Sequence, residues 1–245
     1  MRDRLFMRFR LAQVTNGRQI KDALASTMGD FPDSRRRPYS AIAGHAALDL
    51  INTVSWRLSD DRRIDHLRDY DDVLAWAVQF GFVDETARQT LITLADADPA
   101  RADREFRKVR DLREQLYRAA LPADDGPDAQ AAAVVAAQYT EAIAAARLEP
   151  PSGWQFDVDL ALPRRRLALA AVDVLTGTHP EAVRQCADEE CGWVFIDGSP
   201  RHNRRWCVAA DCGNRNRVRR HTERVRAAAA ATAAATGAGQ CDPRT

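Results

Sequence analysis

Four of the five cysteines form two pairs of matched spacing near the C-terminal end of the 245-residue chain. Four residues separate the members of each pair, and fifteen residues separate one pair from the other. Two short-spaced pairs with a hairpin-sized segment between them can bring four thiolates to one tetrahedral ion, about 2.3 Å from each sulfur. We therefore expect one structural zinc ion. Its predicted ligands are Cys186, Cys191, Cys207 and Cys212.

The expected compartment favours metal binding over disulfides. No apolar signal-peptide core follows the basic N-terminus, and no run in the sequence approaches the ~20 apolar residues that cross a membrane. We therefore expect a cytoplasmic protein without a membrane partner, and clustered cysteines in that reducing environment are usually metal ligands. Cys241 lies outside the paired spacing and is expected to be an unused thiol.

Positive charge is concentrated around the last two ligands, although the net charge of the chain is only +1. Residues 201–226 contain nine arginines but only two acidic residues, Asp211 and Glu223. A local cationic surface of this kind favours a polyanionic partner, so we expect the module to bind DNA. The residues predicted to contact nucleic acid are Arg204, Arg205, Asn214, Arg215, Arg217, Arg219, Arg220 and Arg224.

Some of these polar residues have a second interpretation. Four thiolates around Zn²⁺ leave a net negative charge that nearby cations must offset, and Arg184, Arg205 and Arg215 are candidates for that role. Asn214 could read an adenine, but we favour it as a cap of the helix that follows Cys212.

The elements that must position the ligands are two strands and a helix. Alternation over 193–196 predicts one strand, and residues 204–207 are expected to return as its hairpin partner. With a helix after the last cysteine, this makes a treble-clef-like ββα module over residues 181–226. Trp193 and Trp206 are expected to form its small core. Because that core has too little apolar area to fold alone, we expect the module to unfold without zinc.

Upstream of the module the pattern is mainly helical. Apolar spacings of three and four predict a helical domain over residues 39–180, with one short strand at 154–158. Residues 1–38 are expected to be a disordered leader, and the alanine-rich tail over 227–245 a frayed helix or coil. The fold class is therefore mainly α, with a small zinc-stapled module at the end. The expected helices lie at 41–58, 71–80, 85–96, 99–120, 129–147 and 164–176.

A polar stripe marks the first of these helices. His45, Asp49 and Asn52 recur at i, i+4 and i+7, which places them on one helix face. We favour a buried hydrogen-bond network for these three residues. The alternative is a ligand pocket, which would make the helical domain a sensor.

Two segments resemble known families. The CGNR sequence at 212–215, preceded by the pattern CxxxxCxWxF and by RRWC at 204–207, resembles the CGNR zinc finger family. Residues 44–53 resemble the opening of the ABATE domain, a helical domain that precedes this finger in the family. Together the two resemblances span about residues 40–226. They imply the same four cysteine ligands and a role in stress-induced regulation of transcription.

These observations favour a zinc-dependent DNA-binding regulator of transcription that associates with the nucleoid. Its helical domain would sense a small-molecule effector or form a homodimer. The alternative is an RNA-binding or protein-interaction scaffold that uses the same module. We expect no catalytic residues and no enzymatic activity, because HExxH, P-loop, GxSxG and GxGxxG motifs are absent from the sequence and four thiolates close the zinc site.

Overall fold

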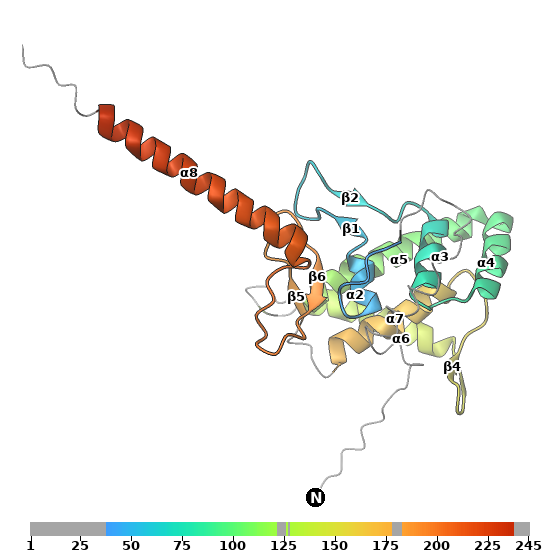
Figure 1. Cartoon of the computed structure of the whole chain (residues 1–245). Coiled ribbons are helices and arrows are strands. Elements are labelled where there is room, and N and C mark those ends of the chain that lie inside the picture. Colours follow the sequence, from blue (N-terminus) through green and yellow to red (C-terminus); the bar gives the residue numbers. More distant parts are fainter. Residues whose placement is uncertain (1–37, 122–125, 127, 178–182, 238–245) are drawn as a thin grey trace, which may run out of the picture.

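The computed structural model describes residues 38–121, 126, 128–177 and 183–237, which form a helical domain and a smaller C-terminal module (Figure 1). The helices of the first domain pack side by side, and the module lies at one end of them. The helices of this domain are α2 (Ala46–Ile51), α3 (Tyr70–Gln79), α4 (Glu85–Ala97), α5 (Pro99–Ala120), α6 (Ala129–Ala144) and α7 (Leu162–Thr176).

Aspartate caps set where several of these helices begin. The side chains of Asp69, Asp84, Asp98 and Asp128 each accept a backbone N–H from the first turn of α3, α4, α5 and α6, respectively. Such caps satisfy donors that the helix itself leaves unpaired. The predicted starts of α4 and α5 are therefore confirmed.

The core of the domain lies between α2, α5, α6 and α7, with α3 and α4 packed at one side. Leu48, Leu112 and Leu116 are fully buried there. Trp76 stacks on Phe80 with their ring centroids 5.1 Å apart. The fold class predicted from the sequence is thus confirmed: the described residues are mainly helical and carry only short two-stranded sheets.

The helix predicted over 41–58 is much shorter than expected. α2 ends at Ile51, and the chain continues as β1 (Val54–Ser55), which pairs with β2 (Ile64–Asp65). Trp56 then adopts a φ of 53°, a left-handed conformation that no helix tolerates. The apolar spacing that suggested a longer helix instead reflects residues that face the core from different elements.

The single strand predicted at 154–158 is half of a hairpin. β4 (Gly153–Gln155) pairs in antiparallel register with β3 (Arg147–Glu149). The predicted helix over 129–147 was therefore too long, because its last residue belongs to this sheet. β3 is exposed throughout, so the core gives its sequence no alternating pattern to recognise.

The C-terminal module contains β5 (Val183–Gln185), β6 (Val194–Ile196), a π-helical turn η2 (Ala209–Gly213) and α8 (Asn214–Gly237). β6 pairs with β5, so the hairpin predicted between 193–196 and 204–207 was wrong. The second segment contains no strand. Its Arg205 carbonyl instead accepts the Ala187 N–H from the turn between β5 and β6, at 2.8 Å.

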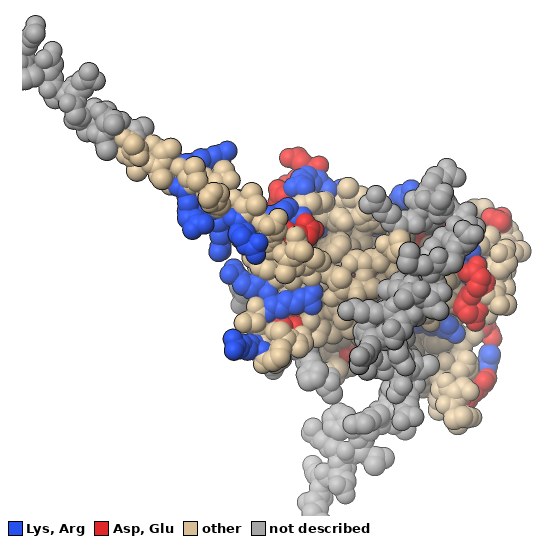
Figure 2. Space-filling model, in the orientation of Figure 1, with Lys and Arg blue, Asp and Glu red and all other residues tan. Residues whose placement is uncertain are grey.

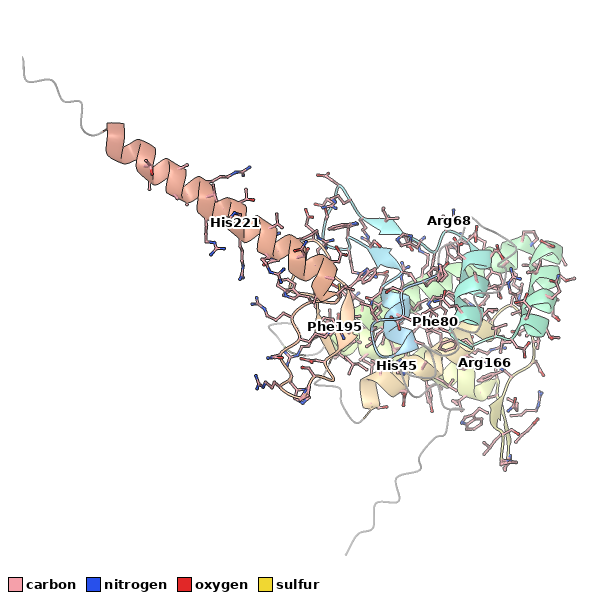
Figure 3. All side chains as sticks on the ribbon, in the orientation of Figure 1. His45, Arg68, Phe80, Arg166, Phe195 and His221 are labelled. Atoms are coloured by element: carbon pink, nitrogen blue, oxygen red, sulfur yellow. The ribbon has the colours of Figure 1, made fainter. Side chains whose placement is uncertain are left out.

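α8 projects from the module into solvent. His221 on this helix lies well away from the body of the molecule (Figure 3), and residues 220–232 are exposed. The predicted tail over 227–245 thus begins as helix. Residues 238–245 lie outside the described residues, as do residues 1–37 of the leader predicted over 1–38 and the predicted boundary near 180. Among the residues that the structure describes, no helix has the length and apolar character needed to cross a membrane.

Candidate metal centre and nucleic-acid interface

The four predicted cysteine ligands converge on one point. Their Sγ atoms all lie within 4.8 Å of one another, and all four residues are buried. Cys207 Sγ lies 3.7 Å from that of Cys191 and 3.4 Å from that of Cys212. A tetrahedral ion with sulfur ligands at about 2.3 Å requires sulfur–sulfur separations of about 3.8 Å, whereas a disulfide requires about 2.05 Å. The donor set therefore fits a closed zinc site.

The protonation of these thiols also points to a cation. Hydrogen bonds from Cys191 and Cys207 lower the pKa of Cys186 to about 2. The pKa of Cys207 is raised, first by the Cys186 sulfur, next by Cys191, and by burial. The four sulfurs thus lie close enough to oppose one another's ionisation. A divalent cation at the centre is what would allow all four sulfurs to ionise.

The first ligand pair lies on the turn between β5 and β6. The Cys186 N–H donates to the Trp193 carbonyl at 2.7 Å, which closes the turn around the sulfurs. Gly192 has a φ of 67°, and a Cβ there would lie 2.7 Å from Arg57 Cβ in the helical domain. Only glycine fits this position, because both its backbone conformation and its surroundings exclude a side chain.

The second pair connects the centre to α8. Cys212 lies in η2, one residue before Gly213 and two before the helix begins. The Cys207 N–H approaches Cys186 Sγ at 3.4 Å, which joins the two pairs. A metal held by these sulfurs would fix the position of the helix relative to the hairpin.

Arg215 is the cation that contacts the sulfurs. Its Nη2 lies 2.9 Å from Cys212 Sγ, and its Nη1 pairs with Asp211 at 2.7 Å. Its guanidinium also lies over the ring of Trp56, 4.2 Å from the centroid. Of the three arginines predicted to offset thiolate charge, Arg184 instead pairs with Asp197 at 3.4 Å. The third, Arg205, is exposed.

Arg204 also serves the inside of the module. Its guanidinium donates to the carbonyls of Trp206 at 3.1 Å and Cys207 at 2.6 Å, and it lies over the Phe195 ring at 4.0 Å. Figure 3 shows Phe195 within the module. Within the predicted nucleic-acid set, the guanidinium groups of Arg204 and Arg215 therefore make contacts that hold the ligand loops.

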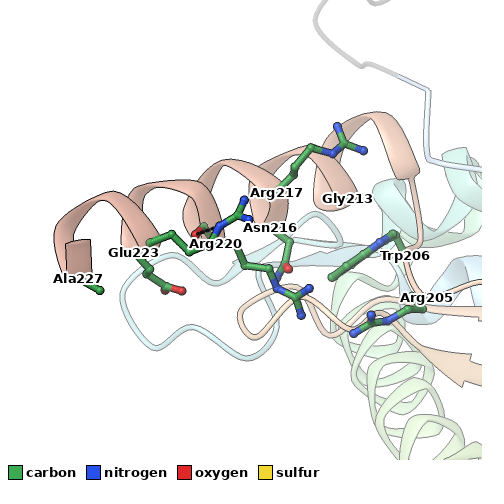
Figure 4. A pocket seen from close by; sticks show the side chains of 9 residues that line it. Arg205, Trp206, Gly213, Asn216, Arg217, Arg220, Glu223 and Ala227 are labelled. Carbon is green, nitrogen blue, oxygen red and sulfur yellow. Dashed lines mark hydrogen bonds between the residues drawn. The ribbon is translucent and has the colours of Figure 1, made fainter. Parts of the chain in front are cut away.

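Four of the predicted residues line one hollow along α8. This hollow encloses about 720 Å³ beside Trp206 (Figure 4), and Glu223 is the one acidic residue in its lining. Arginine side chains gather over the finger and the near end of α8 (Figure 2). The lining arginines form no ion pair with a carboxylate among the described residues. They are Arg205, Arg217, Arg220 and Arg224.

The remaining two predicted residues lie beside the hollow. Arg219 pairs with Glu189 at 3.1 Å and is about one-third exposed. Asn214 is the first residue of α8, and its Oδ1 accepts from Arg217 Nη1 at 3.3 Å. The predicted set thus separates into residues along the hollow, residues inside the module, and residues at its edge.

The polar stripe of α2 holds the module against the helical domain. Asn52 donates to the Val194 carbonyl at 2.9 Å and accepts the Val194 N–H at 2.8 Å. Asp49 accepts the Ala43 N–H at 2.9 Å, and the Ala43 carbonyl accepts the Ile196 N–H at 2.8 Å. β6 is thereby bonded to β5 on one edge and to α2 and the residues before it on the other.

His45 has a separate role from its two partners in the stripe. Its Nδ1 accepts the Ala47 N–H at 3.2 Å at the start of α2, and its Nε2 lies 3.3 Å from Asp173. The three predicted residues therefore do not form one site. Asp49 and Asn52 line a hollow near Trp193, but His45 is not part of that lining.

Comparison with known families accounts for most of the chain. Residues 44–178 match ABATE, described as "Putative stress-induced transcription regulator", and this match spans more than half of the sequence. The chain belongs to the ABATE family. Residues 182–225 match the CGNR zinc finger. No curated protein matches the chain.

The CGNR finger shares its apolar core with the ABATE domain. Val183 and Val194 are buried in the main core of the ABATE domain, while Phe195 packs against the cysteines. The sequence predicted that Trp193 and Trp206 form the small core of the module, and both pack against the buried cysteines and Phe195. Trp193 also reaches the ABATE domain, where its Nε1 donates to the Val54 carbonyl at 2.9 Å.

Sequence reasoning missed the ABATE residues that support the finger. Arg57 N–H donates to the Cys191 carbonyl at 3.0 Å, and Leu58 N–H to the Glu190 carbonyl at 3.1 Å. The Trp56 ring lies between two arginines, with Arg62 above it at 3.4 Å. The one sequence signal was a tryptophan and arginines directly after the helical stripe, which does not by itself indicate a contact with residues far along the chain.

Proposed function

We propose that this ABATE protein is a zinc-dependent DNA-binding regulator of transcription, in which α8 and the loop before Cys207 contact the phosphate backbone. The family description supports regulation of transcription in coarse terms. The finer proposal rests on one observation: Arg205, Arg217, Arg220 and Arg224 share one exposed hollow and have no carboxylate partner among the described residues. Arginine groups that the protein leaves unpaired are available to phosphate oxygens.

The shape of α8 suits this role. A helix of 24 residues that extends from the finger can lie along a DNA groove without contact from the ABATE domain. Trp206 lines the hollow and lies close to the start of the helix, since a Cβ at Gly213 would approach its ring at 3.1 Å. Arg217, Arg220 and Arg224 project from the helix itself, and Arg205 projects from the loop beside it.

A single zinc ion would be held by the four clustered cysteines, Cys186, Cys191, Cys207 and Cys212. It would cross-link the finger and would take no part in catalysis. Arg215 would offset the charge of the sulfurs, and Trp56 keeps Arg215 in place. The proposal includes no enzymatic step, because four protein ligands leave no open coordination position. It places the protein in the cytoplasm, where DNA is accessible to it.

The test is binding of fluorescent duplex DNA by the zinc-loaded chain between 50 and 200 mM salt. If the four lining arginines contact phosphates, the log–log slope is expected near −0.9 for each neutralised phosphate, or about −3 to −4 in total. Arg217→Ala and Arg220→Ala should each weaken binding and reduce the slope by about one unit. The proposal fails if the chain shows no salt-dependent binding to any duplex.

A matched control separates the hollow from general charge. Arg107 on α5 is exposed and pairs with Asp103, so Arg107→Ala removes the same charge far from the finger. This variant should bind DNA as the wild type does. Tighter binding to single-stranded RNA than to duplex DNA, or no binding to either, would favour the RNA-binding or scaffold alternative.

A further inference from the structure

A second hollow lies where the ABATE domain meets the finger. It encloses about 600 Å³, which is within the range of roughly 300 to 1,000 Å³ common for small-molecule sites. Both domains contribute to its lining: Asp49 comes from α2, Asn52 directly follows that helix, and Trp193 comes from the finger. A molecule bound there would touch the two domains at once.

One of the carboxylates that line this hollow lacks a positively charged partner among the described residues. Three carboxylates line the hollow, and two of them, Asp65 and Asp72, pair with arginines at 2.8 and 2.9 Å. Asp49 is 4% exposed and has no cationic partner among the described residues. Burial raises the pKa of Asp49 to about 7, although the N–H of Ala43 lowers it. A buried carboxylate of this kind favours a ligand that brings the missing positive charge.

An organic cation fits this lining better than a metal ion. Among the residues that the structure describes, the cysteine cluster is the only group with metal-ligand geometry, so Asp49 has no second or third ligand to share an ion with. The aromatic side chains of Tyr39 and Trp193 line the same hollow. Aromatic rings stabilise organic ammonium groups, particularly where water is excluded. We propose that the hollow binds a small organic amine, whose ammonium group pairs with Asp49.

Occupancy of this site would act on the contacts that hold the finger. Asp49 accepts the Ala43 N–H, and the Ala43 carbonyl in turn accepts the Ile196 N–H of β6. Asn52 bonds to Val194 on the same strand. An amine at Asp49 therefore changes the support of β6, and its effect on DNA affinity rests on the function proposed above. The binding site itself does not depend on that function.

The experiment is a titration of the full-length, zinc-loaded chain at pH 8, followed by NMR. The two probes are phenethylamine and its neutral counterpart 2-phenylethanol. The amine should shift the indole N–H signal of Trp193 and the side-chain amide signals of Asn52, whereas the alcohol should not. Asp49→Asn should weaken amine binding at least about tenfold, because it removes the charge but keeps an oxygen that accepts the Ala43 N–H.

Asp111→Asn is the matched control, since Asp111 is an exposed acid on α5 outside the hollow. This variant should bind the amine as the wild type does. Equal binding of amine and alcohol, no shift with either probe, or unchanged amine binding by Asp49→Asn would each overturn the proposal. The wild-type comparison of amine with alcohol decides it even if Asp49→Asn does not fold. None of these readouts involves DNA, so they fail or succeed separately from the proposed function.

Discussion

The ABATE domain and the finger use arginine in opposite ways. In the ABATE domain, Arg113 and Arg164 are 1% exposed, and carboxylates surround them: Arg113 pairs with Asp65 at 2.8 Å, and Arg164 with Glu105 at 2.7 Å. On the finger, three arginines of α8 are exposed and lack such partners among the described residues: Arg217, Arg220 and Arg224. The same residue type therefore stabilises one domain and is left available for a ligand in the other.

The two regions also differ in what holds them together. The ABATE domain has an apolar core of leucine, valine and aromatic side chains from six helices. The finger has four buried sulfurs, Phe195 and the strand β6, which bonds on one edge to Ala43 and Asn52 on either side of α2. The ABATE domain thus supports the finger on one side, and the cysteine cluster on the other side is where a metal would add further support.

Loss of the metal should have the largest effect and should be confined to the finger. Cys207→Ser removes a ligand from a site that contributes of order 10 kcal/mol in zinc peptides. Hydrogen exchange should then show loss of protection over β5, β6 and η2, with α5 and α7 still protected. Cys241→Ser, outside the site, is the control. Unchanged exchange in Cys207→Ser would contradict the metal centre.

Removal of a buried arginine should be the next largest effect. Arg164→Ala leaves Glu105 buried and partly unpaired, although Lys108 still contacts it at 2.9 Å, so we expect a loss of about 3 to 5 kcal/mol in unfolding free energy. Arg220→Ala on α8 should leave stability nearly unchanged. Urea denaturation measures both variants. If Arg164→Ala and Arg220→Ala lost equal unfolding free energy, arginine would not have different roles in the two domains.

The buried carboxylate of Asp49, where the ABATE domain meets the finger, should make the stability of the protein depend on pH. The folded-state pKa of Asp49, about 7, exceeds its ordinary value of 3.8, so folding favours the protonated form. Its contribution to stability is complete below pH 3.8 and is lost as the pH rises to about 7. Asp49→Asn should therefore be more stable than the wild type at pH 8, by at most about 4 kcal/mol, and the difference should shrink at pH 5.

Denaturation of both proteins at pH 5, 6, 7 and 8 tests this prediction, and titrations shared by the two chains cancel in the difference. The comparison fails if the difference is independent of pH. A variant less stable at pH 8 would mean that the Asp49 charge is already compensated within the protein.

The smallest effect should come from the contact between α2 and β6. Asn52→Ala removes two hydrogen bonds and leaves the buried N–H and carbonyl of Val194 without partners, at a cost of about 1 to 3 kcal/mol. Amide exchange at Val194 should accelerate more than exchange within α5. Asn203→Ala, an exposed change in the finger, provides the reference. If amide exchange at Val194 and within α5 accelerated equally, the finger and the ABATE domain would open as one unit.

Local patterns explain what could be predicted from the chain. The starts of α4 and α5 follow from Asp84 and Asp98, because an N-cap acts on residues only three positions away. The convergence of the four cysteines followed from spacing alone, since each pair closes a turn of a few residues. The short β3 and β1 strands escaped detection because each has two or three residues and little periodicity.

The sequence by itself determined the grouping of the four cysteines, the mainly helical class and the concentration of arginine near the C-terminal end. Only the tertiary structure decided which arginines lack a carboxylate partner among the described residues. It also decided that β6 pairs with β5 and that Asn52 bonds to a residue 142 positions away. The physical reason is the range of the interactions. Caps, turns and metal knuckles are set by neighbours in the chain, whereas the role of a polar side chain depends on which distant groups the fold places beside it.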